Sequence, residues 1–265
     1  MKERIGLFSP PSFDMTGREI IEHTAELGLS LLEPYPYREL LRFEPEQARA
    51  LAAYARERGV RMQCFSTATT LAGPGADEAL AELLRWVDVA AALGVPWFHH
   101  TLYCALDAAE CTMPYDAVLH EVVPRARKVF DYAAQHGMRC LYEPQGLYFN
   151  GCEGFGKLLE AIDRPVGVVL DTGNPAFVGE QPDAFAERFA DRIVHVHVKD
   201  YVLRPGQPPQ DVGLGQGDIR LRRTLEILAR HRYSGRYVLE YVAPGEEQRQ
   251  SLAVLEQMLT ELGTL

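Results

Sequence analysis

The chain has 265 residues, a length that suits one large domain and matches a common size of α/β barrels. Its 47% hydrophobic and 24% charged residues are ordinary for a globular protein, and no apolar run approaches the ~20 residues of a membrane span. The net charge of −10 argues against a broad surface for nucleic acid or anionic membranes. We therefore expect a protein that binds neither nucleic acid nor membrane.

The N-terminal stretch MKERIGLFSP enters a strand directly and lacks the apolar segment of a secretory signal. The five cysteines are an odd number, lie far apart and form no CxxC pair, which is typical of reduced thiols packed as small apolar groups. Both features predict a cytoplasmic protein without disulfides.

One unit recurs along the chain: an amphipathic helix, a turn and a short apolar strand. In four of these units a glycine stands where a helix end needs left-handed backbone, at Gly28, Gly59, Gly94 and Gly137. The pattern predicts eight strands, each followed by a helix, at about 4–9, 29–33, 60–65, 95–101, 138–143, 165–171, 192–198 and 236–241.

Several helix starts carry their own signals. Thr16 and Glu19 have the spacing of a capping box. Pro45, Pro114 and Pro182 suit the first turn of a helix, and the last of these predicts a short helix over 182–190.

Eight such units in a chain of this length predict an α/β fold, a single (β/α)₈ TIM barrel over residues 1–265. The rival is an open doubly wound sheet, which usually carries a glycine fingerprint after its first strand. Here that turn reads SPPSFDMTG, and the glycine-rich GLGQG at 213–217 follows a polar loop instead of a strand.

Acidic and imidazole side chains end four consecutive strands. They are Glu143, Asp171, His197 and Glu240, at the end of the barrel where active sites lie. Alternation along the strand turns His197 into the barrel together with His195, and turns Val194, Val196 and Val198 toward the helices. A single carboxylate at a strand end is often only solvated or a helix cap. Three carboxylates and one imidazole on four adjacent strands indicate a functional site. His195 lies one layer deeper in the barrel, which fits a supporting role behind the site.

Three carboxylates and one imidazole make a hard, mostly oxygen ligand set. Such a set suits Mn²⁺, Mg²⁺, Co²⁺ or Fe²⁺ better than a closed structural zinc site. We expect one divalent ion, Mn²⁺ in the first place.

The chain resembles the sugar phosphate isomerase/epimerase family with the xylose isomerase-like barrel. The similarity covers essentially the whole chain and is carried by LYEPQG, VVLDTGNPAFVG, HVHVKD, LGQGDI and YVLEY, in that order. The family includes ketose 3-epimerases, hydroxypyruvate isomerase, inosose-processing enzymes and the endonuclease IV type of repair nuclease.

The resemblance implies a metal held by Glu143, Asp171, His197 and Glu240, with Glu143 and Glu240 also acting as the acid/base pair. The family commonly has a substrate-contacting histidine three residues after the aspartate. This chain has Asn174 there, which can donate a hydrogen bond to a hydroxyl but cannot titrate near neutrality.

Four further residues are candidates for substrate binding. His99 and His100 end the fourth strand, Glu33 ends the second, and Lys199 could neutralise an anionic group of the substrate. The strand-one loop from Ser9 to Met15 and the aromatic residues Tyr35, Tyr37 and Tyr103 are expected to shape the pocket.

Together these features predict a metal-dependent sugar isomerase or epimerase that removes the proton next to a carbonyl, through a cis-enediolate held on the metal. The alternative is a dehydratase or lyase acting on a keto-sugar or an inosose-type keto-polyol. A repair nuclease is less favoured because of the acidic net charge and because of Asn174. A non-catalytic sugar-binding subunit is less favoured because the set of four residues is intact. No phosphate grip is evident, so a non-phosphorylated sugar or polyol-derived ketone is expected, and a homo-oligomer stays open.

Overall fold

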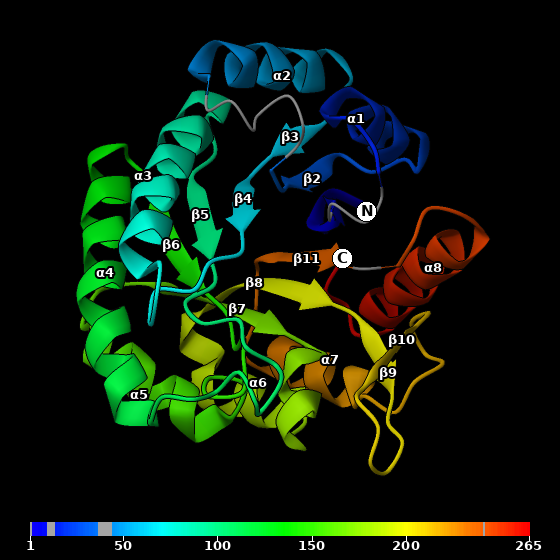
Figure 1. Cartoon of the computed structure of the whole chain (residues 1–265). Helices are drawn as coiled ribbons and strands as arrows, with labels where there is room; N and C mark the ends of the chain where they lie inside the picture. Colours follow the sequence, from blue (N-terminus) through cyan, green and yellow to red (C-terminus); the bar gives the residue numbers. More distant parts are fainter. Residues whose placement is uncertain (1, 10–13, 37–43, 241) are drawn as a thin grey trace.

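The computed structural model describes residues 2–9, 14–36, 44–240 and 242–265. Within them, eight α-helices surround a parallel sheet (Figure 1). The strands of this sheet are β1 (Ile5–Ser9), β2 (Leu31–Pro34), β3 (Arg61–Met62), β4 (Cys64–Thr67), β5 (Trp97–His100), β6 (Arg139–Tyr142), β7 (Gly167–Asp171), β8 (Ile193–Val198) and β11 (Arg236–Leu239). The helices are α1 (Gly17–Glu26), α2 (Pro45–Glu57), α3 (Ala76–Leu93), α4 (Tyr115–Gln135), α5 (Cys152–Ile162), α6 (Pro182–Phe189), α7 (Leu221–Arg230) and α8 (Glu246–Glu261).

The sheet closes almost completely on itself. Its order is β3-β2-β1-β11-β8-β7-β6-β5-β4, and all neighbours are parallel. β3 and β4 are two halves of the predicted third strand, separated at Gln63, and they pair with β2 and β5 respectively. The two ends of the sheet therefore belong to one strand, and the predicted (β/α)₈ barrel is confirmed.

The local signals in the sequence have the expected structural roles. Thr16 and Glu19 form a reciprocal capping box at the start of α1. Pro45 and Pro182 begin α2 and α6, whereas Pro114 precedes α4 as its N-cap. Gly94 ends α3 with φ of 77°, a conformation that costs a residue with a side chain about 1 kcal/mol or more.

The interior of the barrel is filled in layers. Cys64, Leu141 and Val169 form an apolar layer low in the barrel, against which Trp97 and Val194 pack. The inward position of Val194 contradicts the expectation that it faces the helices. An irregularity in the pairing of β7 with β8 at Val168/Val169 shifts the alternation at this point.

Gly167 makes room for this layer. A Cβ atom at Gly167 would lie 2.5 Å from Leu141 Cδ2 and 2.7 Å from Val194 Cγ2, so both side chains occupy the space that the glycine leaves.

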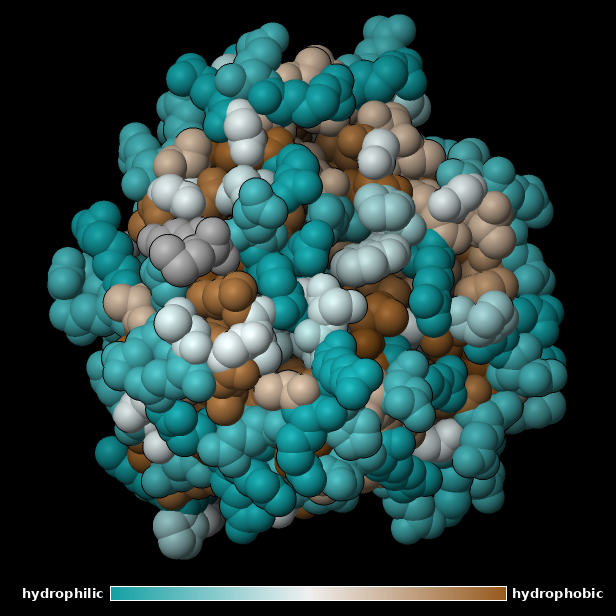
Figure 2. Space-filling view, turned by 180° about the vertical axis from the view of Figure 1, so that it is seen from behind, coloured by the Kyte–Doolittle hydropathy of each residue, from teal (hydrophilic) through white to brown (hydrophobic). Residues whose placement is uncertain are grey.

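A short antiparallel hairpin, not predicted from the sequence, follows β8. It consists of β9 (Asp200–Val202) and β10 (Gln210–Val212). Of the helices described, none combines the length and hydrophobicity that crossing a bilayer requires. In the view of Figure 2, hydrophobic residues lie in several groups among hydrophilic ones that cover most of the surface.

Candidate metal centre and active site

Four of the predicted side chains converge at the C-terminal end of the strands. Ligand atoms of Glu143, Asp171 and His197 lie within 4.8 Å of one another. Glu240 joins them, with its Oε2 3.4 Å from His197 Nδ1. Their positions on the strands bring these side chains together. Glu143 and Glu240 come directly after β6 and β11, Asp171 ends β7, and His197 faces inward from β8.

Lys199 lies inside the same cluster. Its Nζ is 2.9 Å from Asp171 Oδ2 and 3.2 Å from Glu240 Oε2, and the residue is 3% exposed. The predicted substrate-binding lysine is thus a buried cation shared by two carboxylates. An ammonium in this position offsets part of the charge that three clustered carboxylates would bring together.

A second layer of polar side chains lies beneath His197. Glu33 is 2% exposed, and its Oε1 accepts from His197 Nε2 at 3.0 Å and also from Ser66 Oγ, while its Oε2 is bonded to His195 Nε2. The cavity lining does not include Glu33, although the sequence made it a candidate for substrate binding. A carboxylate behind a histidine fixes the ring and leaves the other nitrogen, here Nδ1, aimed at the ligand cluster.

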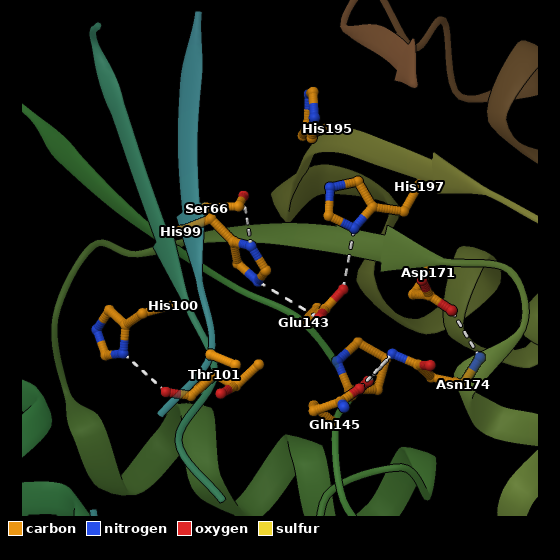
Figure 3. A network of polar contacts seen from close by, with 12 residues as sticks. Ser66, His99, His100, Thr101, Glu143, Gln145, Asp171, Asn174, His195 and His197 are labelled. Carbon is orange, nitrogen blue, oxygen red and sulfur yellow. Dashed lines mark hydrogen bonds and ion pairs between the residues drawn. The ribbon is translucent and has the colours of Figure 1, made fainter. Parts of the chain in front are cut away.

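The two adjacent histidines of β5 have opposite orientations. His99 points toward Glu143, with its Nε2 3.6 Å from Glu143 Oε1 and its Nδ1 2.9 Å from Ser66 Oγ (Figure 3). His100 points away, toward Thr101 O at 2.8 Å, and packs edge-on against Tyr142. Because successive side chains in a strand face opposite ways, only His99 reaches the cavity.

The two glutamates have shifted pKa values in opposite directions. Burial raises the pKa of Glu240 to about 8, against the smaller lowering effects of Lys199 and His197. Burial also acts on Glu143, but His99, His197 and Lys199 outweigh it and lower the pKa of Glu143 to about 2. Without a metal ion, the two carboxyls therefore differ in their affinity for a proton.

The donor set fits a divalent cation. Asp171 Oδ1 accepts from the backbone N–H groups of Gly173 (2.8 Å) and Asn174 (2.6 Å), which leaves Oδ2 directed at the cluster. Asp171 Oδ2 and Glu240 Oε2 are buried and lie 2.9 Å and 3.2 Å from Lys199 Nζ, so a single ammonium faces two carboxylate oxygens. Buried carboxylate oxygens of this kind are stabilised by a cation.

Asn174 connects two strand ends. Its Nδ2 donates to Pro144 O at 2.9 Å and to Gln145 Oε1 at 2.7 Å, and the residue is 5% exposed. Asn174 lines the cavity, but its two amide protons are directed at protein groups and not at the cavity, in contrast to the expected donor role.

The cavity above the cluster has a volume of about 190 Å³. Of the predicted site residues, Glu143, Glu240, His197, His99, Lys199 and Asn174 line it, as does Tyr35. Tyr37 and residues 10–13 of the predicted loop fall outside the described residues. Several other residues that line the cavity were not predicted from the sequence, namely Phe8, Ser66, Thr67, Gln145, Phe177, Tyr201 and Asp211. Gln145 could have been found, since it lies two residues after Glu143.

The β9–β10 hairpin covers one side of the cavity with Tyr201 and Asp211. Asp200 holds the hairpin to the glycine-rich turn, because its carboxylate accepts from the N–H groups of Gly215 (2.9 Å), Gly217 (3.0 Å) and Ile219 (3.3 Å). A Cβ at Gly217 would lie 2.2 Å from Asp200 Oδ1, so this glycine is required by close approach. The GLGQG turn thus supports the cavity wall.

Comparison with known proteins assigns the chain to a family of TIM barrels. A family described as "Xylose isomerase-like TIM barrel" matches residues 21–258. The rhizopine catabolism protein MocC of Rhizobium meliloti is 35% identical over 132 residues, which cover 43% of this chain and 41% of that protein. An inosose dehydratase of Clostridium tetani is 30% identical over 129 residues, 43% of each chain. The chain thus aligns with less than half the length of these relatives.

Solved structures agree over nearly the whole chain. The IOLI protein with a bound zinc atom has a TM-score of 0.78 at 16% identity and covers 98% of this chain and 97% of its own. The 3-keto-D-glucoside 4-epimerase of E. coli has a TM-score of 0.76 at 18% identity, covering 97% and 100%. A xylose isomerase-like barrel of Mycobacterium smegmatis in complex with magnesium has a TM-score of 0.74 at 16% identity, covering 98% and 97%. At these identities the likeness establishes the fold.

Proposed function

Because the chain belongs to the xylose isomerase-like TIM barrel family, we propose that it is a metal-dependent enzyme that moves a proton next to the carbonyl group of a sugar. The observation that carries the proposal is the convergence of Glu143, Asp171, His197 and Glu240 beside a cavity, with one glutamate at each end of the four-strand arc. The leading form of the proposal is an isomerase or epimerase.

Glu143, Asp171, His197 and Glu240 would hold one divalent ion, for which we favour Mn²⁺. Structures with the same fold have been solved with zinc and with magnesium, which supports a divalent cation in general. When bound, such an ion polarises a carbonyl group and so acidifies the neighbouring C–H bond.

The two glutamates would divide the proton transfer between them. Glu143, whose pKa is lowered to about 2, is ionised at neutral pH and can accept the proton. Glu240, at the other end of the arc, would deliver a proton to the substrate. Delivery to the opposite face of the same carbon gives epimerisation, and delivery to the adjacent carbon gives aldose–ketose isomerisation.

A neutral substrate suits the rest of the cavity. Lys199 is the one lysine or arginine among the described lining residues, and its Nζ already contacts Asp171 and Glu240. His99 and Asn174 offer hydrogen bonds to hydroxyl groups. We therefore favour a non-phosphorylated sugar or a polyol-derived ketone.

Dehydration is the second candidate, favoured by the similarity to two clostridial proteins named inosose dehydratase, at 30% and 27% identity. The first step would be the same proton abstraction. Loss of a β-hydroxyl would then require a proton donor at the leaving oxygen, a role open to Glu240 in its protonated form.

Proton exchange with solvent tests the proposal and separates its two forms. The metal-loaded protein is incubated in D₂O with 2-ketohexoses such as D-tagatose and D-psicose, and with an inosose. NMR then reads deuterium at the carbon next to the carbonyl. Exchange with an epimer or aldose as product supports the leading form, and an unsaturated or deoxy product supports dehydration. A protein that binds these compounds without exchange would be a sugar-binding subunit.

Metal analysis addresses the nuclease alternative. One equivalent of a divalent ion per chain is expected. Three zinc ions per chain would instead favour phosphodiester hydrolysis, for which Asn174 lacks the imidazole that a multi-zinc site requires.

A further inference from the structure

Asn174 and Gln145 form a fixed pair of amides at the edge of the cavity. The Asn174 backbone N–H donates to Asp171 Oδ1 at 2.6 Å, and its side-chain Nδ2 donates to Pro144 O and Gln145 Oε1 (Figure 3). Asn174 thus ties the end of β7 to the segment that follows β6. Because Asn174 is 5% exposed, water cannot easily replace these bonds.

The direction of both amides follows from Pro144. A backbone carbonyl can only accept, so the Asn174 atom facing Pro144 O must be Nδ2. The Gln145 atom 2.7 Å from Nδ2 must then be its acceptor, Oε1. Gln145 Nε2 finds no acceptor and Asn174 Oδ1 no donor within the ranges that the structure describes, and both residues line the cavity. One donor and one acceptor therefore remain on the cavity side.

We propose that Gln145 Nε2 and Asn174 Oδ1 form the subsite for one hydroxyl group of the substrate, and that Asn174 positions Gln145 for this contact. The inference rests on the proposed function, since it assumes a polyhydroxy substrate in this cavity. A hydroxyl donates one hydrogen bond and accepts others, which matches the pair. An ionised phosphate or carboxylate only accepts and would meet Asn174 Oδ1 unfavourably. The subsite therefore selects a neutral sugar position.

Asn174 stands where the family resemblance leads one to expect a histidine, and the pair with Gln145 explains what this replacement does. A histidine at position 174 would contact the substrate through a titratable ring. The amide at 174 instead passes the donor role to Gln145, and neither amide titrates. Substrate binding at this subsite is therefore independent of pH.

The test uses the metal-loaded full chain and four variants. Gln145→Glu keeps the size of the side chain but removes the donor, Gln145→Ala removes the whole contact, and Asn174→Ala releases Gln145; the fourth combines both alanine changes. Gln207→Glu adds the same charge at an exposed loop position and serves as the control. Calorimetry measures binding of D-tagatose, D-psicose and an inosose, and the exchange assay gives kcat and KM.

Loss of one neutral hydrogen bond weakens binding by about tenfold, and kcat changes by less than about threefold. Gln145→Glu and Gln145→Ala are expected to do this, while Gln207→Glu leaves binding unchanged. If Asn174 acts through Gln145, the change Asn174→Ala weakens sugar binding less in the Gln145→Ala variant than in the wild type. Divalent-ion affinity should stay within twofold in Asn174→Ala, because the bond to Asp171 comes from the backbone.

Monodeoxy analogues of the sugar that binds give the decisive comparison. One analogue, lacking the contacted hydroxyl, should bind the wild type and Gln145→Ala equally well. The inference is overturned if Gln145→Glu binds within twofold of the wild type, or if Gln145→Ala weakens every analogue to the same extent. Binding by the wild type without proton exchange would overturn the proposed function alone, and no binding by the wild type would overturn both.

Discussion

The two ends of the barrel interior differ in chemistry although the same strands build both. At the C-terminal end a cavity of about 190 Å³ is lined by acidic and imidazole side chains, including Glu143, Glu240 and His197. At the N-terminal end a hollow of about 510 Å³ is lined by residues near the strand starts, including Trp97 and Arg236. The apolar layer of Cys64, Leu141 and Val169 belongs to neither lining.

The connections explain the difference. Where a helix returns to the next strand, turns such as those at Gly94 and Gly137 are short and contain none of the site residues. After the strands, longer segments such as the β9–β10 hairpin bring side chains over the cavity. The larger hollow is therefore not the better candidate for a site, because it lacks the clustered ligands of the smaller one.

Glu240→Gln should have the largest effect, and only on the C-terminal end. The proposal requires turnover to fall by at least about a thousandfold, since the variant removes both an acid and a metal ligand. In the metal-free protein the free energy of unfolding should rise at pH 7, because burial raises the pKa of Glu240 to about 8 and folding at that pH costs a proton uptake that glutamine does not need. Exchange kinetics and urea unfolding measure the two quantities, with exposed Glu246→Gln as control. Near-normal turnover would remove Glu240 from the mechanism.

Leu141→Ala should lower the stability of the fold and leave the ion site intact. Removing a fully buried side chain from the apolar layer costs about 2–5 kcal/mol of unfolding free energy. The folded fraction should keep its divalent-ion affinity, since the change lies below the ligand cluster. Urea unfolding and calorimetry check this. An equal loss of ion affinity would show that the two ends are coupled.

Addition and removal of metal should act through the C-terminal end alone. An ion at about 100 times its dissociation constant raises the free energy of unfolding by about 2.7 kcal/mol. Thermal unfolding with Mn²⁺ and after chelation measures the shift. The shift should vanish in Glu143→Gln and persist in Leu141→Ala, and a shift that persists in Glu143→Gln would place the ion elsewhere.

Glu33→Gln probes the layer between the ends. It removes the carboxylate that accepts from His197 Nε2, and loss of such a partner typically lowers metal affinity by about 10–100-fold. Calorimetric titration with a divalent ion measures the loss, and exposed Glu26→Gln is the control. Unchanged affinity would mean that Glu33 does not orient His197.

His100 should give the smallest effect, visible only as a pH dependence of stability. Burial lowers the pKa of His100 to about 3, below its ordinary 6.5. Its contribution is full above pH 6.5 and is lost as the pH falls toward 3, because the unfolded chain then takes up a proton that the folded chain does not. The slope for one proton is about 1.4 kcal/mol per pH unit. In His100→Gln the dependence between pH 6.5 and 5 should be shallower, and an unchanged slope would assign it to other groups.

The barrel and the convergence of its four strand-end side chains could be predicted from local sequence patterns. Hydrophobic alternation and the helix–turn–strand repeat are local properties, and parallel strands bring their ends to one edge wherever the chain folds into a barrel. The sequence pattern therefore sufficed to group Glu143, Asp171, His197 and Glu240 in one site.

The contacts made across the barrel and between loops could not be predicted in this way, because they depend on how distant segments pack. Alternation says that His99 and His100 face opposite ways, but strand packing decides which of them faces the cavity. The shifted register that turns Val194 inward, and the ion pairs of Lys199, depend on neighbours distant in sequence. The same holds for the Asn174–Gln145 pair, because its geometry requires two separate loops to meet within hydrogen-bond distance, and no local pattern encodes that distance.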